Sequence, residues 1–168
     1  SKLYDAVFLE YATVESLKKQ VEQYQEEIVL LSESIDLETT EALRQPEPAQ
    51  DAIQLLRQAL EVKVLFQDAL DAVVDKTRAS IERVEVTHAP VKRLSRVAQK
   101  QLFGSTADTY PSENASNIKD MVRAMVSFPT MGGIAAFVKN LRESPDLLKV
   151  VRIKNRFHDA ERDASGWR

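Results

Sequence analysis

Alternating cationic residues near the C-terminus are the clearest chemical feature of this sequence. Residues 150–157, VVRIKNRF, have the pattern of a short apolar strand with a cationic end. In a strand, Arg152, Lys154 and Arg156 lie on one face, because alternate side chains point the same way. Three like charges on one face repel each other unless an anion or an acidic partner lies against them. The pattern therefore predicts that these side chains bind phosphate.

An aromatic ring and a further cation follow in Gly166-Trp167-Arg168. Trp167 is the only tryptophan of the chain, and an indole ring can stack on a nucleic-acid base. Arg168 offers the fork of donors that suits phosphate. A purine nucleotide carries both groups, so we predict that Trp167 and Arg168 contact one. The alternative is that Trp167 packs in the core or at an interface.

A second cationic group lies on a helix expected at residues 91–102, just after Pro90. Lys92, Arg96 and Lys100 have i, i+4, i+8 spacing and therefore share one helical face. We predict that they bind phosphate as point charges and forks. The alternative is an ordinary solvent-exposed face.

Asp120 and Arg123 lie where a helix is expected to give way to a strand. Mg²⁺ commonly takes one or two carboxylates together with substrate phosphates. A carboxylate beside a cationic pocket therefore predicts that Asp120 is a Mg²⁺ ligand. The alternative is that Asp120 caps a helix or forms a salt bridge.

Several classes of site are disfavoured. The chain of 168 residues has no cysteine, which excludes disulfides and thiolate metal sites. Its two histidines, His88 and His158, lack metal-ligand spacing, and no Ser-His-Asp or HExxH pattern is present. These absences argue against hydrolase and zinc chemistry.

Two long helices are expected before these residues. The first spans residues 2 to about 35, with a near-heptad stripe of Leu3, Val7, Tyr11, Val14, Leu17, Val21, Tyr24, Ile28, Leu31 and Ile35. Residues 36–45 suggest a short helix, broken at Pro46-Glu47-Pro48. The second long helix runs from about Ala49 to Val84. A Pro-containing bend between them predicts an antiparallel hairpin over residues 1–88.

The C-terminal part, residues 89–168, is expected to mix helix and strand. After a loop at 104–116, residues 118–128 read as helix and then strand, and Met131 to Leu141 as a short helix. Leu147 to Ile153 reads as a buried strand. The fold class is therefore α+β and mostly α, with the hairpin followed by a basic helix and a small strand-helix-strand unit.

The charge is unevenly distributed along the chain. Residues 1–90 hold 9 Lys and Arg against 18 Asp and Glu, whereas residues 91–168 hold 14 against 8. The basic half could bind nucleotide phosphate, nucleic acid or an acidic partner, or could simply pack on the acidic half. No apolar run approaches a membrane span and no signal peptide is evident. We therefore expect a soluble, intracellular, cytoplasmic protein without membrane contact.

Residues from about 89 to 168 resemble the front half of a RelA/SpoT-type nucleotidyltransferase domain. The matching positions, in chain order, are Lys92, Val97 and Lys100 on the basic helix, Asp120, the strand from Val150 to Lys154, and Gly166-Trp167-Arg168. The sequence departs from that family at Pro90, which stands for an arginine, and at Arg96, which stands for a serine. Arg123 is displaced from the family's position, and the family's later strand with the catalytic glutamate is absent from this sequence.

The resemblance implies a divergent nucleotidyltransferase-type module, with Asp120 and Arg123 as catalytic residues and Mg²⁺ as cofactor. It implies that the site is incomplete, and the chain inactive, as given. The alternative is a structural or assembly subunit that docks a protein partner, or a second copy, through its amphipathic helices. RNA binding is disfavoured, because aromatic residues are not interleaved with the cations.

Overall fold

The computed structural model describes residues 14–35, 51–81, 83–103, 118, 120–153 and 155. They form the helices α2 (Glu15–Glu33), α4 (Ala52–Arg78), α5 (Leu94–Phe103) and α6 (Met131–Arg142), and the strands β1 (Glu85–His88) and β2 (Ala124–Ser127). The α+β, mostly helical fold class is thereby confirmed. None of the described helices has the length and apolarity that a membrane crossing needs.

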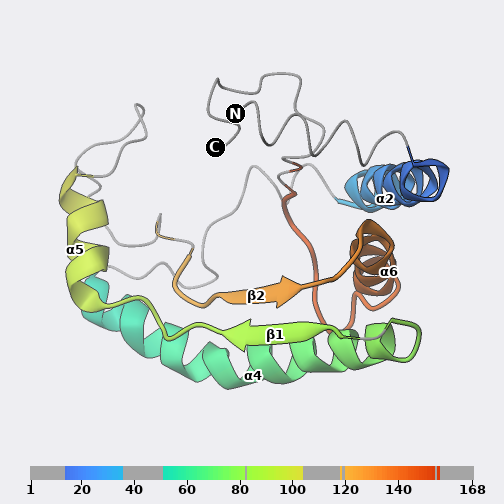
Figure 1. Cartoon of the computed structure of the whole chain (residues 1–168). Coiled ribbons are helices and arrows are strands. Elements are labelled where there is room, and N and C mark those ends of the chain that lie inside the picture. The colour runs from blue at the N-terminus through green and yellow to red at the C-terminus, as the bar shows by residue number, and fades with distance from the viewer. Residues whose placement is uncertain are drawn as a thin grey trace.

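The two strands form an antiparallel sheet with α4 along it and α6 at its end (Figure 1). Glu85 pairs with Ser127 and His88 with Ala124. Exposed and half-buried residues alternate along both strands, so one face of the sheet packs and the other meets solvent. Val86 and Val126 on the packed face join Leu70 and Val74 of α4 in one apolar cluster.

Strand β1 was not expected, because the second helix was predicted to continue to Val84. Helix α4 instead ends at Arg78, and the chain turns through Arg83, whose φ of 62° is left-handed. The guanidinium of Arg78 donates to the Val84 carbonyl over 3.2 Å and 3.4 Å, which holds this turn against the helix end. β-Branched Val86 and Thr87 then favour a strand.

The start of α4 agrees with the sequence. Asp51 follows the proline-containing break, and its Oδ1 accepts hydrogen bonds from the backbone N–H groups of Ile53 and Gln54, each over 2.8 Å. This is an N-cap, which satisfies donors that have no partner within the helix. The cap fixes where the longest described helix begins.

The two long helices do not pair along a shared seam as the predicted hairpin requires. Figure 1 shows α2 nearly end-on while α4 runs across the view, so their axes cross steeply. Helix α6 lies against both of them. Tyr24 and Leu31 of α2 are buried against Ala135 and Val138 of α6. The apolar stripe of the first helix was therefore identified correctly, but its partner is α6.

Helix α6 confirms the helix predicted at Met131 to Leu141. The hydroxyl of Thr130 accepts a hydrogen bond from the Gly133 N–H over 3.2 Å, which caps its start. Gly133 is buried, and a Cβ added to it would lie 3.2 Å from the Cβ of Phe128. The close approach of α6 to the end of β2 thus favours a residue without a side chain, because a Cβ would push Phe128 by a few tenths of an ångström.

Two further expectations need correction. The predicted helix before β2 is absent from the described residues 118 and 120–123, although the strand itself is confirmed. Residues 148–153 are extended but form no strand, so the predicted strand from Leu147 to Ile153 is wrong. A turn in which the Leu147 and Leu148 N–H groups donate to the Ser144 carbonyl leads into this segment. Its apolar side chains still contribute to the core, because Val150 and Ile153 pack against the buried cluster that Tyr24 and Leu31 of α2 form with α6.

The packing of α4 predicts a sharp contrast between two of its residues. Leu55 is 1% exposed, whereas Val62 is 52% exposed. Leu55→Ala should lower the free energy of unfolding by about 2–5 kcal/mol, because it removes buried methyl groups and leaves a cavity. Val62→Ala should change it by less than about 0.5 kcal/mol. Urea denaturation followed by circular dichroism measures both, and equal losses would contradict the described core.

Candidate functional site

Lys92 and Asp120 form an ion pair at one end of the sheet, although 27 residues separate them in the chain. Lys92 lies between β1 and α5, and only 7% of its side chain is exposed, against 44% for Asp120. Burying a charge is costly unless it is paired, so this carboxylate stabilises the position of the ammonium. Asp120 is thus salt-bridged, as the alternative interpretation of this residue held.

Backbone pairing brings these two side chains together. Beyond the last ladder pair, the Ala89 N–H donates to the Arg123 carbonyl over 3.0 Å, and the Lys92 N–H donates to the Met121 carbonyl over 3.1 Å. The segments 89–92 and 120–123 therefore continue the antiparallel course of β1 and β2. The register of the sheet sets the distance between the cation and the carboxylate.

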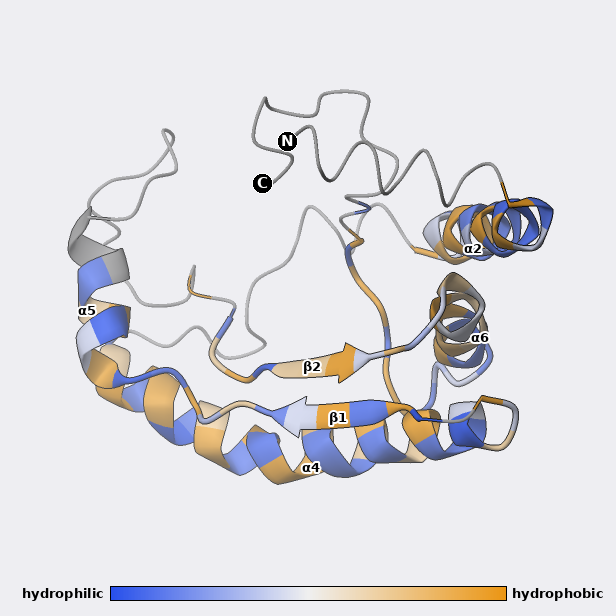
Figure 2. Cartoon of the chain, viewed as in Figure 1, coloured by the Kyte–Doolittle hydropathy of each residue, from blue (hydrophilic) through white to orange (hydrophobic). Residues whose placement is uncertain are grey.

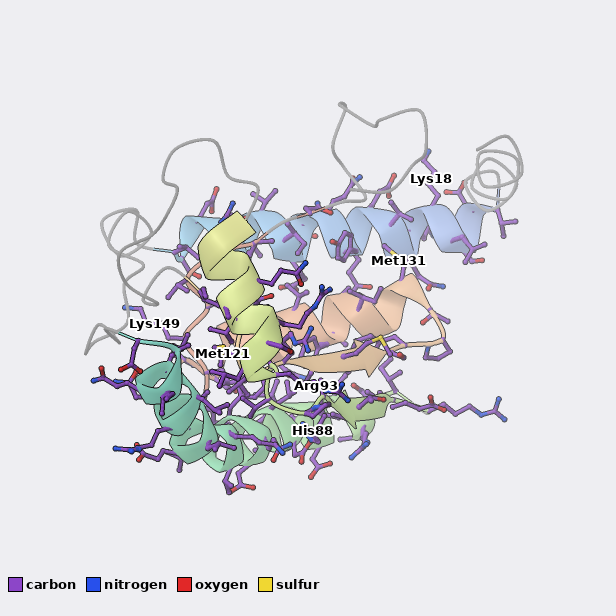
Figure 3. The ribbon with its side chains drawn as sticks, turned by 90° about the vertical axis from the view of Figure 1, so that its left-hand side faces the viewer. Lys18, His88, Arg93, Met121, Met131 and Lys149 are labelled. Carbon is purple, nitrogen blue, oxygen red and sulfur yellow. The ribbon has the colours of Figure 1, made fainter. Side chains whose placement is uncertain are left out.

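Three arginines surround this end of the sheet with exposed side chains. Arg93 immediately precedes α5, Arg96 lies in the first turn of α5, and Arg123 immediately precedes β2. Figure 3 shows Arg93, Met121 and His88 around the lower end of α5. The Arg96 guanidinium donates to the Gln99 side chain over 2.6 Å. Together with Lys92 and Asp120 these residues carry four positive charges and one negative charge, a net +3.

The shared helical face predicted for Lys92, Arg96 and Lys100 is not formed, because α5 begins only at Leu94. Lys92 precedes the helix and turns inward to Asp120, whereas Arg96 is exposed. The side chain of Lys100 lies outside the described residues. The basic helix is therefore confirmed as an element, but its cationic stripe is not.

The other predicted cations are not placed beside this site. Arg152 is exposed on the extended segment 148–153, which is not a strand, so the expected one-face alternation with its neighbours is not established. The remaining predicted residues, Lys154, Arg156, Trp167 and Arg168, lie outside the described residues.

One polar pair near the site was not anticipated. The Nε2 of His88 lies 3.0 Å and 3.2 Å from the two carboxylate oxygens of Asp71, which links β1 to α4. The Nδ1 of His88 is buried and has no partner among the described residues. From the sequence, His88 was considered only as a metal ligand and was disfavoured by its spacing from His158. No local pattern indicates its contact with Asp71 on α4. The described residues contain no group of three side chains suited to a metal.

An apolar cavity of about 530 Å³ forms a separate feature, which the sequence did not indicate. It opens between the packed face of β2, helix α6 and the segment 148–153, and is lined by residues that include Phe66, Leu70, Val126, Phe128, Phe137 and Val150. Tyr24 and Lys149 are the residues of its lining that carry polar side-chain groups. Such a lining suits an apolar group rather than phosphate.

Tyr24 lies at this cavity, and its hydroxyl donates to Asn155 Oδ1 over 2.9 Å. Burial raises the pKa of the Tyr24 phenol, because the charged phenolate is poorly solvated there. The phenol therefore stays protonated in the folded chain at a pH at which it ionises in the unfolded chain.

Comparisons with protein-family models, with curated proteins and with solved structures found no match. The resemblance to the RelA/SpoT-type domain therefore stays a prediction.

The Lys92–Asp120 pair predicts an asymmetry between its two partners. Asp120→Ala removes the carboxylate from a buried ammonium and should lower the free energy of unfolding by about 1–3 kcal/mol. Lys92→Met keeps the aliphatic stem and leaves a half-exposed carboxylate that water can solvate, so it should cost less. Paired urea denaturation curves measure the difference, and a larger loss for Lys92→Met would contradict the burial described.

The raised pKa of Tyr24 predicts a loss of stability in alkali. Since the folded chain holds the phenolic proton more tightly, this contribution is complete below the unfolded pKa of about 10 and disappears as the pH rises through the folded pKa. The free-energy difference between the native chain and Tyr24→Phe should therefore fall as the pH rises above about 10. Parallel stability curves for the two proteins would contradict it.

Proposed function

We propose that this chain binds the phosphates of a purine nucleotide at the end of the sheet that carries Lys92 and Asp120. One observation supports the proposal most. The sequence assigned Lys92 to phosphate and Asp120 to Mg²⁺ independently, and the two side chains are in contact. Exposed guanidinium groups of Arg93 and Arg123 lie on the same two segments. A cationic site of this kind suits a polyanion.

The chemistry proposed is phosphoryl transfer in a nucleotidyltransferase-type module similar to the RelA/SpoT family. In such reactions the protein contributes positioning and stabilisation of charge rather than covalent catalysis. Arg123 and Arg96 would hold phosphate oxygens by charge-assisted hydrogen bonds. Lys92, fixed by Asp120, would contribute a positive charge that does not need to reorganise.

Asp120 fits a Mg²⁺ ion only in part. It offers one half-exposed carboxylate, and one of its oxygens already contacts Lys92. Mg²⁺ is commonly bound by one or two carboxylates with the remaining ligands from substrate phosphates and water. A Mg²⁺ ion at Asp120 would accordingly arrive with the nucleotide, and would supply further charge neutralisation for the phosphates.

Nucleotide binding can be measured by isothermal titration with GTP and ATP, with and without Mg²⁺. We expect saturable binding that Mg²⁺ strengthens, and quenching of Trp167, the sole tryptophan. Arg123→Glu and Arg96→Glu should each weaken binding at least about tenfold, which corresponds to about 1.4 kcal/mol. Lys18→Glu is the matched control, because Lys18 is an exposed cation on α2, far from α5 in Figure 3.

The control variant should bind within about twofold of the native chain. Equal weakening by Lys18→Glu would show a non-specific response to net charge. An absence of saturable binding at millimolar nucleotide would overturn the proposal.

A docking role for the helices is the second candidate function. The observation that favours it is a row of exposed apolar side chains on α4, where Ile53, Leu60 and Val64 are 62%, 54% and 58% exposed. An amphipathic helix that presents such a row commonly lies against another helix.

A further inference from the structure

The cavity beside α6 has the size and the lining of a binding site rather than of a packing gap. Its volume is about 530 Å³, and thirteen of the fifteen described residues that line it have wholly apolar side chains. Protein interiors are close-packed and hold few spaces larger than a water molecule. An ordered water needs about two to four polar partners, which apolar side chains do not provide. Ligand sites of about 300–1,000 Å³ with mostly apolar walls are common in proteins.

The cavity is elongated, because it follows one face of α6. Ile134 and Leu141 on this face are seven residues apart, which is about 10 Å along the helix. The cavity also reaches α2 and α4, which lie on opposite sides of α6 in Figure 1 and in Figure 3. Figure 2 shows hydrophobic residues, in orange, on β2, on α6 and along the segment 148–153. An elongated apolar space suits a flexible alkyl chain better than a compact ring.

The volume of the cavity limits its occupant to one alkyl chain. In another protein, an apolar cavity of about 150 Å³ holds a benzene ring. At the same volume per carbon atom, a cavity of about 530 Å³ holds about twenty carbon atoms. A single fatty-acid chain therefore fits, whereas the two chains of a phospholipid do not.

The charge at the cavity is positive. Lys149 is the one charged residue among the described residues of the lining, and its side chain is exposed. No ion pair found among the described residues involves Lys149 or the nearby Asp146. Residues 146–155 hold three Lys and Arg against that single acid. A lysine commonly lays its stem on an apolar surface and keeps its ammonium in water, where it can pair with an anion.

We infer that this cavity binds a fatty-acid anion, with the alkyl chain along α6 and the carboxylate at the Lys149 ammonium. Val150 and Ile153 line the cavity, whereas Lys149 and Arg152 are exposed. The segment 148–153 thus offers apolar contacts to a chain and positive charge to its head group. This gives the apolar and cationic pattern of the segment a role of its own. The inference goes beyond the proposed nucleotide binding and does not rest on the phosphate site.

Isothermal titration of the full chain with decanoate and with decan-1-ol, both below the concentrations at which they aggregate, tests the inference. We expect saturable binding of one molecule of either compound per chain. Lys149→Glu should weaken the binding of decanoate at least about fivefold, because an attraction becomes a repulsion. The same variant should bind decan-1-ol, which has no charge, within about twofold of the native chain. Lys139→Glu is the matched control, because Lys139 is an exposed lysine of α6 outside the lining.

Two further measurements place the alkyl chain. Ala124→Leu adds a side chain to the lining and should weaken the binding of both compounds at least about tenfold. Circular dichroism checks that this variant keeps its fold. In the native chain, the methyl resonances of Ile134 and Val150 should shift as decanoate is added. Those of Leu55, which is buried in a separate apolar cluster, should stay where they are.

Three results would overturn the inference. The first is an absence of saturable binding of decanoate at millimolar concentration. The second is an equal effect of Lys149→Glu on decanoate and decan-1-ol, or an equal effect of Lys139→Glu on decanoate, because Lys149 would then not bind the carboxylate. The third is binding of decanoate that shifts the methyl resonances of Leu55 but not those of Ile134 and Val150, because the chain would then lie elsewhere.

Discussion

Helix α6 is the element on which the rest of the described structure depends, because it is buried from two sides. A two-stranded sheet is not stable in water without a packed face, and a single amphipathic helix such as α2 needs a partner. Helix α6 serves both. It meets α2 through Ala135 and Val138, and it approaches the sheet through Phe137, whose ring lies 5.3 Å from that of Phe128.

Polar contacts also fix the position of α6. The Gly132 N–H donates to the Gln20 side chain over 3.1 Å at one end, and Arg142 pairs with Glu27 over 3.1 Å at the other, so both ends are tied to α2. Asn140 donates to the buried hydroxyl of Thr77 over 3.0 Å, which ties α6 to α4. These bonds specify one orientation where apolar packing alone would tolerate several.

The fold was predictable where local signals agreed with tertiary packing. Such local signals are the apolar stripe that holds Tyr24 and Leu31, the start of the second long helix near Asp51 and the short helix after Thr130, and the described residues contain each of them. The antiparallel hairpin failed because periodicity shows that a helix has an apolar face, but does not show which element covers it. The strand β1 was missed because four residues are too few for a distinct period.

The candidate site was predictable in its residue types but not in its arrangement. Lys92 was assigned to a helical face because the pattern of cations was regular. Its inward turn depends on a carboxylate 28 positions further along the chain, and on a strand register that no local pattern reveals. The same applies to His88 and Asp71, whose contact exists only because β1 lies on α4. The apolar cavity is assembled from several elements and has no signature in any one of them.

The close packing at Gly133 has a consequence for the cavity beside it. Phe128, which an added Cβ at Gly133 would press, also lines that cavity. A side chain at Gly133 would therefore shift Phe128 by a few tenths of an ångström and alter the shape of the cavity, although Gly133 is not one of its lining residues. Substitution of Gly133 is therefore a way to change which apolar groups the cavity accepts while all of its lining residues stay the same.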